Sequence, residues 1–138
     1  MDALIVDDSP VIRRVLQLVL QPLGNCDIVQ SGQKALDSLR HRLTEKRSYD
    51  LICLDLGLPD LEGLDVLRQV RSLEAEFGIQ VRSRIMIVTS SDDLDMVRAA
   101  SQNGADAYLV KPLDKQRFLK ALEGLGLTTD ASKTAAQR

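Results

Sequence analysis

Residues 50–71 of the chain are DLICLDLGLPDLEGLDVLRQVR. The run Leu51–Leu54 is apolar without polar alternation, which is typical of a strand covered on both faces, as in a parallel sheet. A carboxylate, Asp55, follows this run directly. After a turn-forming segment, apolar residues return at helical spacing through Val66 and Val70. A strand, a polar strand end and a helix in this order indicate one β–α unit.

The same succession of apolar run, loop and amphipathic segment occurs five times along the chain. The expected helices begin at capping residues such as Ser9, which precedes Pro10, and end near glycines such as Gly24 and Gly104. The succession predicts an α/β fold, a doubly wound (βα)5 flavodoxin-like sandwich with a parallel five-stranded sheet of order 2-1-3-4-5. The candidate strands are Ala3–Val6, Cys26–Gln30, Leu51–Leu54, Ile85–Val88 and Ala107–Val110.

Apolar positions at helical spacing define the helix faces that are expected to pack on this sheet. In the first helix this face begins at Val11 and Ile12, and in the fourth it begins at Leu94. In the fifth helix it includes Phe118 and Leu119.

The composition excludes several classes of protein. The chain has 138 residues, 44% of them hydrophobic and 28% charged, which suits one globular domain. No apolar run reaches the length of a membrane span, the N-terminus lacks the basic region of a secretory signal, and two cysteines are too few for a disulfide scaffold. Four aromatic residues offer little for stacking nucleic-acid bases. We therefore expect a cytoplasmic protein with no direct nucleic-acid binding and no membrane insertion.

Polar side chains follow four of the five expected strands directly. Asp7 and Asp8 follow the first strand, Asp55 the third, Thr89 the fourth and Lys111 the fifth. Because the carboxyl ends of parallel strands meet at one edge of a sheet, these groups are expected to lie together. Neighbouring carboxylates repel by roughly 4 kcal/mol at an effective dielectric near 20, and oxygen ligands are those that Mg²⁺ prefers. The sequence predicts a Mg²⁺ site here, which would also accept Mn²⁺.

The chemistry expected at this edge is phosphoryl transfer. A carboxylate beside a divalent cation can attack a phosphoryl group and form an acyl phosphate. A lysine and a hydroxyl can stabilise the oxygens of the group in transfer. The chain has no GxxxxGK[ST] motif, so the phosphate is not expected to arrive on a bound nucleotide. These features favour a phosphoryl acceptor over an NTPase.

Four stretches, each reaching a strand end, resemble the receiver domain of two-component response regulators, the CheY-like family. They are LIVDDSPVIRRVL at 4–16, the stretch at 50–71, IMIVTSS at 85–91 and GADAYLVKPL at 104–113. The resemblance implies a receiver domain over residues 1–125, with a flexible tail or linker stub over 126–138. The chain would be a stand-alone CheY-like protein, which Met1 and the polar tail favour, or the receiver part of a larger regulator.

The resemblance implies a role for each polar group at the sheet edge. Asp55 would be the phosphoacceptor. Lys111 would pair with the phosphoryl group, and its peptide bond to Pro112 would be cis. The Mg²⁺ ligands would be Asp7, Asp8, Asp55 and the backbone carbonyl of Gly57.

The resemblance also implies a switch. Thr89 would move towards the phosphate, and Tyr108 would swing inward as it does, although its position alone indicates only a half-buried strand residue. This motion would remodel the face of the fourth helix, fifth strand and fifth helix for an unknown downstream protein. Candidate contacts there, otherwise ordinary solvated positions, are Arg98, Gln102, Lys115, Gln116 and Lys120.

The phosphodonor implied by the resemblance is a sensor histidine kinase or a histidine phosphotransfer protein. It would dock against Val11, Arg13 and Arg14. The protein would be a signalling domain and not an enzyme, limited to self-catalysed phosphotransfer and slow autodephosphorylation. We expect a monomer or a phosphorylation-dependent dimer.

Three features depart from the common family pattern. Gly57 and Ser91 are small where the family tunes access of the dephosphorylating water, so the phosphate lifetime is expected to be unusual. The segment Glu74–Arg84 is a few residues longer than the family pattern and would extend the third helix or form a charged loop. Two other functions remain compatible with the residues. One is a pseudo-receiver that only binds proteins, and the other is a Mg²⁺-dependent aspartate-nucleophile phosphatase, which would want a second acid at Gly57.

Overall fold

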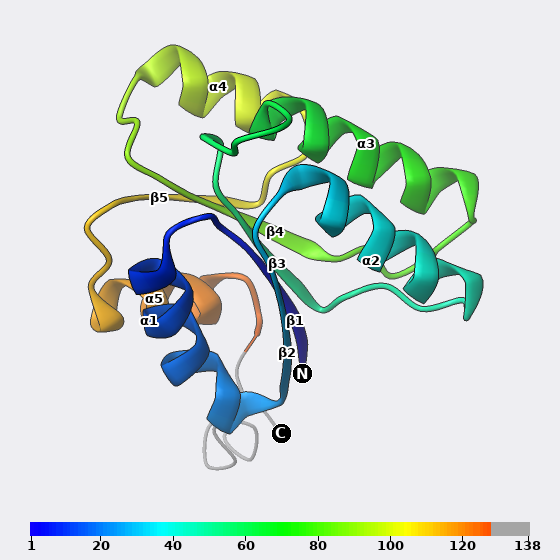
Figure 1. Ribbon diagram of the computed structural model, residues 1–138, viewed down its shortest axis with the longest axis horizontal. Coiled ribbons are helices and arrows are strands. Elements are labelled where there is room, and N and C mark those ends of the chain that lie inside the picture. Colours follow the sequence, from blue (N-terminus) through cyan, green and yellow to red (C-terminus); the bar gives the residue numbers. More distant parts are fainter. Residues whose placement is uncertain (128–138) are drawn as a thin grey trace.

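The computed structural model describes residues 1–127, and Figure 1 shows their arrangement. Five strands within these residues form one parallel sheet in the order β2-β1-β3-β4-β5. The predicted fold and strand order are confirmed, and each predicted strand ends within one residue of its observed bounds. Of the predicted tail over 126–138, residues 128–138 lie outside the described range. The strands are β1 (Asp2–Val6), β2 (Asn25–Val29), β3 (Leu51–Leu54), β4 (Arg84–Thr89) and β5 (Ala107–Val110).

A helix follows each strand and starts just beyond its carboxyl end. Side-chain caps fix several of these starts, because an oxygen accepts a hydrogen bond from an amide that the helix leaves free. Ser9 caps α1, Asp93 caps α4 and Asp114 caps α5. The helices are α1 (Pro10–Leu20), α2 (Gly32–Thr44), α3 (Gly63–Glu76), α4 (Leu94–Gln102) and α5 (Lys115–Gly124), with a 3₁₀ turn η1 (Gln21–Leu23) after α1.

Two helical layers cover the sheet. Helices α2, α3 and α4 lie on one face, and α1 and α5 lie on the other (Figure 1). Successive residues of one strand enter opposite cores, since side chains alternate across a sheet. Leu4 of β1 packs in the core of α2 and α3, whereas Ile5 packs in the core of α1 and α5. Polar groups of the central strands therefore gather where those strands end.

Three residues expected in the helix–sheet core are exposed. Val11 is 70% exposed and Leu94 is 68% exposed. Each lies in the first turn of its helix, and this turn extends past the carboxyl end of the preceding strand, where no sheet lies beneath it. Leu119 is 39% exposed because its neighbour Phe118 takes the core position of α5. The apolar spacing therefore predicted the helices correctly but overestimated the burial of two first-turn residues and of Leu119.

The segment Glu74–Arg84 is part helix and part loop, and only Arg82 is charged within the loop. Helix α3 continues to Glu76, and residues 77–83 form a loop before β4. Glu74, the first residue of this segment, is 0% exposed. Its carboxylate accepts hydrogen bonds from the hydroxyls of Ser48 and Ser83 and pairs with Arg71. The buried Glu74 carboxylate thus links the end of the loop, at Ser83, to α3.

Candidate functional site

The carboxyl ends of β1, β3, β4 and β5 bring the predicted polar residues to one edge of the sheet. The adjacent strands β1 and β3 end in register, with Val6 beside Leu54. The amide of Asp55 donates to the Val6 carbonyl at 3.0 Å, so Asp55 and the residue after Val6 leave the sheet side by side. On β5, the amide of Lys111 donates to the Thr89 carbonyl at 2.7 Å. The strand pairing thus places residues from four strands around one point.

Asp7 is the most deeply buried acid of the group, only 1% exposed. Its Oδ1 accepts from the Ser9 amide at 2.9 Å, and its Oδ2 lies 3.0 Å from Nζ of Lys111. Burial raises the pKa of Asp7 above its ordinary value, although the contacts with Ser9 and Lys111 act in the opposite direction. Asp7 is therefore a carboxylate whose charge depends on nearby cations.

Asp55 is held in place from two sides. Its Oδ1 accepts from the Gly57 amide at 3.1 Å, and its Oδ2 accepts from Lys111 at 3.2 Å. Behind it, Gly63 packs so closely that a Cβ there would stand 2.8 Å from the Asp55 carbonyl oxygen and 2.3 Å from Cα of Leu56. The missing side chain of Gly63 lets the start of α3 lie directly against the Asp55 backbone.

Lys111 supplies the positive charge of the site. Burial disfavours its ammonium, but the contacts with Asp7 and Asp55 outweigh this and raise the pKa of Lys111 above its ordinary value. The Lys111 side chain therefore carries its positive charge at neutral pH. The peptide bond between Lys111 and Pro112 is cis.

The acidic cluster fits a divalent cation. Carboxylate oxygens of Asp7, Asp8 and Asp55 lie within 4.8 Å of one another, and Asp8 is exposed to solvent. Three carboxylates against the one ammonium of Lys111 leave two negative charges uncompensated. Among residues 1–127, the buried Oδ2 of Asp7 accepts no well-directed hydrogen bond and has only the ion pair with Lys111. A hard cation with oxygen ligands would complete the charge balance, so this donor set suits Mg²⁺.

Thr89 and Tyr108 lie on the neighbouring strands β4 and β5. Thr89 ends β4 and is 4% exposed. Tyr108 is half-buried on β5, and its hydroxyl donates to the Ser91 carbonyl at 2.9 Å. Burial raises the pKa of Tyr108, so its hydroxyl remains a donor at neutral pH. The loop after Thr89 is therefore tied to β5 through this tyrosine.

A comparison with known protein families identifies this arrangement. The family model described as response regulator receiver domain matches residues 3–123. The chain belongs to this family. Receiver domains accept a phosphoryl group, bind Mg²⁺ through an acidic pocket and interact with histidine kinases or phosphotransfer proteins. They are signalling domains, generally distinct from conventional enzymes.

Individual relatives agree with the family assignment. The receiver is 33% identical to the regulatory protein LuxO of Vibrio vulnificus over 114 residues, which are 82% of this chain and 23% of LuxO. It is 32% identical to the sensory/regulatory protein RpfC of Xanthomonas campestris over 138 residues, which are 99% of this chain and 18% of RpfC. The chain therefore spans less than a quarter of the length of these two curated relatives.

A solved structure supports the same fold. A response regulator receiver domain (CheY-like) from Methylobacillus flagellatus is 30% identical and matches with a TM-score of 0.73. The match covers 91% of this chain and 98% of that one. Within residues 1–127, no helix of the receiver combines the length and the apolar character needed to cross a bilayer.

The two predicted partner surfaces lie on different elements. Val11 and Arg14 are exposed on α1 near the acidic cluster, and the guanidinium of Arg13 lies 3.4 Å from the Asp7 carbonyl oxygen, its acceptor. On α4, Arg98 is exposed and pairs with Asp95 at 3.9 Å. The remaining residues predicted for the second surface are also exposed, namely Gln102 on α4 and Lys115, Gln116 and Lys120 on α5.

Sequence reasoning missed the role of Asp60. Its carboxylate accepts from the amides of Gly32 at 2.8 Å and Gln33 at 2.9 Å, at the first turn of α2. Hydrogen bonds from Gln33 and Gly32 lower the pKa of Asp60. Asp60 thereby ties the loop after Asp55 to a helix that begins 28 residues earlier in the chain. No local pattern indicates a cap over such a separation.

Proposed function

We propose that this receiver accepts a phosphoryl group on Asp55 from the phosphohistidine of a histidine kinase or a histidine phosphotransfer protein. The observation that carries the proposal is the position of Asp55, whose Oδ2 accepts from Lys111 while its carboxylate belongs to the cluster with Asp7 and Asp8. A carboxylate nucleophile beside three charged side chains suits attack on phosphorus.

In the proposed transfer, an oxygen of the Asp55 carboxylate forms a bond to phosphorus as the bond from phosphorus to the histidine nitrogen breaks. The products are an acyl phosphate on Asp55 and a free imidazole. Lys111 is placed to bind an oxygen of the phosphoryl group, because its ammonium already lies 3.2 Å from Asp55 Oδ2. Hydrolysis by water later releases inorganic phosphate and restores the carboxylate.

Asp7, Asp8 and Asp55, with the backbone carbonyl of Gly57, would hold Mg²⁺. When bound, the ion supplies positive charge against the oxygens in transfer. The buried Asp7 is the carboxylate that most needs such a partner, because its Oδ2 has only the Lys111 ammonium nearby. Asp8, being exposed, leaves one side of the cluster accessible to a phosphodonor docked over Val11 and Arg14.

The proposed output is a shift between two conformations. The Thr89 hydroxyl would donate to the phosphoryl group, and Tyr108 would respond, since its hydroxyl holds the loop that follows Thr89. A phosphate on Asp55 therefore biases the surface of α4, β5 and α5, where Arg98 and Lys115 are available to a downstream protein.

The test is phosphorylation by a small-molecule donor. We expect acetyl phosphate with Mg²⁺ to give a single phosphate adduct by intact-mass spectrometry, and EDTA or Asp55→Asn to abolish it. The matched control is Asp37→Asn, an exposed carboxylate on α2 that should be without effect. An adduct that persists in Asp55→Asn, or that forms equally in EDTA, would refute the proposal. Sustained turnover of phosphate esters would instead indicate a phosphatase.

A further inference from the structure

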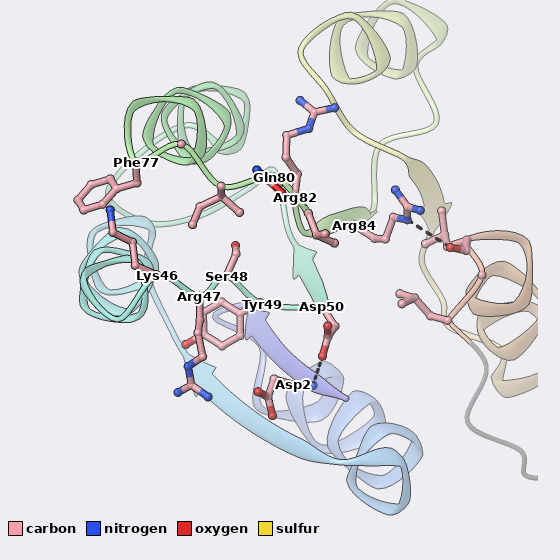
Figure 2. Close-up of a pocket in the computed structure, with 16 residues that line it drawn as sticks. Asp2, Lys46, Arg47, Ser48, Tyr49, Asp50, Phe77, Gln80, Arg82 and Arg84 are labelled. Carbon is pink, nitrogen blue, oxygen red and sulfur yellow. Dashed lines mark hydrogen bonds between the residues drawn. The ribbon is translucent and has the colours of Figure 1, made fainter.

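A second concave site lies at the opposite end of the sheet from Asp55. A cleft of about 710 Å³ opens among the segment before β3, the loop over residues 77–83 and the end of α5 (Figure 2). Its charged lining residues include Asp50, Lys46, Arg47, Arg82 and Arg84. These residues take no part in the phosphoacceptor site.

The cleft carries an excess of positive charge. Four basic side chains and two acidic ones, Asp2 and Asp50, line it, which leaves two positive charges. Two lining charges are paired with residues outside the lining, Asp2 with Arg42 at 2.8 Å and Arg47 with Glu45 at 3.8 Å. Within residues 1–127, neither the ammonium of Lys46 nor the guanidinium of Arg82 forms an ion pair. These cations remain available to a ligand.

The cations surround the cleft and do not converge on one point. Figure 2 shows Lys46 and Arg47 on one side and Arg82 on another. Nε of Arg84 donates to the Leu125 carbonyl at 3.3 Å. A compact anion such as a free phosphate would require convergent donors. Spaced cations instead suit a chain that presents carboxylates at intervals.

An apolar side chain stands among these cations. Val81 is 85% exposed, the most exposed large hydrophobic residue of the described chain, and it lies directly before Arg82. Phe77 and Ile79 add half-buried apolar surface to the lining. An exposed apolar group with a charged border is the composition of a protein-docking surface.

The loop that presents Val81 and Arg82 is fixed before any ligand arrives. At its end, the amide of Ser83 donates to the buried Glu74 carboxylate at 2.8 Å, and the Ser83 carbonyl accepts from Arg71 at 2.8 Å. At its start, the Ile79 amide donates to the Glu74 carbonyl at 3.0 Å. A loop held at both ends loses less conformational freedom on binding.

We propose that this cleft, defined by Lys46–Asp50 and residues 77–84, docks an acidic segment of a partner protein that carries an apolar side chain. Carboxylates of the segment pair with Lys46 and Arg82, and its apolar residue packs on Val81. Because the cleft and Asp55 occupy opposite ends of the strands, the receiver can hold this partner while phosphotransfer proceeds at the other end. The proposal is independent of phosphorylation.

The test uses a fluorescein-labelled peptide in which glutamate alternates with leucine. We expect its binding to shift backbone amide resonances of residues 46–50 and 77–84 in the full chain, and to weaken with added salt. Arg82→Glu should weaken the affinity for the peptide about five-fold. Val81→Ser should also weaken it, by a smaller factor. The matched control Arg40→Glu, an exposed arginine on α2, should bind as the native chain does.

Four results would overturn the proposal. The first is equal binding of a peptide with lysine in place of glutamate. The second is an equal loss of affinity in Arg40→Glu and Arg82→Glu. The third is a set of resonance shifts confined to α1. The fourth is displacement of the peptide by inorganic pyrophosphate at matched ionic strength with the same resonance shifts, which would make the cleft a compact anion site. Phosphorylation by acetyl phosphate is measured separately and does not enter these outcomes.

Discussion

The guanidinium of Arg71 lies 2.8 Å from Oε1 of Glu74, a carboxylate with no exposed surface. The same guanidinium pairs with Asp106 at 2.8 Å and donates to the carbonyl of Gly104 at 2.7 Å. One arginine on α3 therefore holds the connections that lead into β4 and β5. The Arg71–Glu74 pair is a buried ionic contact at the end of the sheet opposite Asp55.

Removing Arg71 alone should be strongly destabilising. Arg71→Met leaves the buried Glu74 charge without its cation, and breaking such a pair costs about 3–5 kcal/mol. Denaturant unfolding should show this loss, and the double variant Arg71→Met/Glu74→Leu should recover part of it because no buried charge remains. The control is Arg68→Met, whose ion pair with Asp65 is exposed and which should cost less than about 1 kcal/mol. A double variant less stable than Arg71→Met would contradict this account.

Glu74 also marks the limit of what could be predicted from the sequence. Hydrophobic runs and capping residues predicted the sheet order, and the residues after each strand predicted the group of Asp7, Asp55 and Lys111, because strand ends converge by topology. Glu74 could not be placed in the same way. Its partners Ser48 and Ser83 lie 26 and 9 residues away, and its helical position resembles those of exposed acids.

The same limit applies to single residues at the helix ends. Val11 and Leu94 fit the apolar spacing of their helices, yet they lie past the ends of the strands and are exposed. Spacing identifies which face of a helix is apolar, but it does not show how far the sheet extends beneath that face. The cap that Asp60 forms on α2 depends likewise on a loop position that only the folded chain defines.

Tyr49 should make the fold sensitive to alkaline pH. Burial and the hydrogen bond that its hydroxyl donates to Asp27 raise the pKa of Tyr49 to about 12 from 10.0. The neutral phenol is thus favoured by folding, so this stabilisation is complete below pH 10 and is lost as the pH rises through 12. Two pKa units correspond to about 2–3 kcal/mol.

The measurement is unfolding free energy against pH for the native chain and Tyr49→Phe. The stability difference between them should shrink by about 2–3 kcal/mol from pH 10 to pH 12. The chain has two tyrosines and no tryptophan, so Tyr49 is the one tyrosine left in Tyr108→Phe. The tyrosinate absorbance of this variant should therefore titrate near pH 12. A midpoint near 10 in the folded chain would disprove the shift.

Mg²⁺ should stabilise the receiver whether or not it is phosphorylated. The ion relieves repulsion among Asp7, Asp8 and Asp55 only in the folded state, where their oxygens lie within 4.8 Å. At ten times its Kd, Mg²⁺ should add about 1.4 kcal/mol of stability, which raises the Tm by roughly 3–5 °C. Calorimetry at constant ionic strength measures this, and Asp8→Asn should reduce the rise. An equal rise with Na⁺ would indicate general screening instead.

Gly57 and Gly63 both follow Asp55 in the chain, but only the substitution of Gly63 by alanine should be destabilising. A Cβ at Gly63 would stand 2.3 Å from Cα of Leu56, so Gly63→Ala must push the start of α3 away from the Asp55 backbone. The overpacking should cost about 1–3 kcal/mol and slow phosphorylation by acetyl phosphate. A Cβ at Gly57 meets only Oδ1 of Asp55, at 3.9 Å, so Gly57→Ala should leave the Tm unchanged. A Gly63→Ala variant with native stability and native phosphorylation rate would show that α3 does not position Asp55.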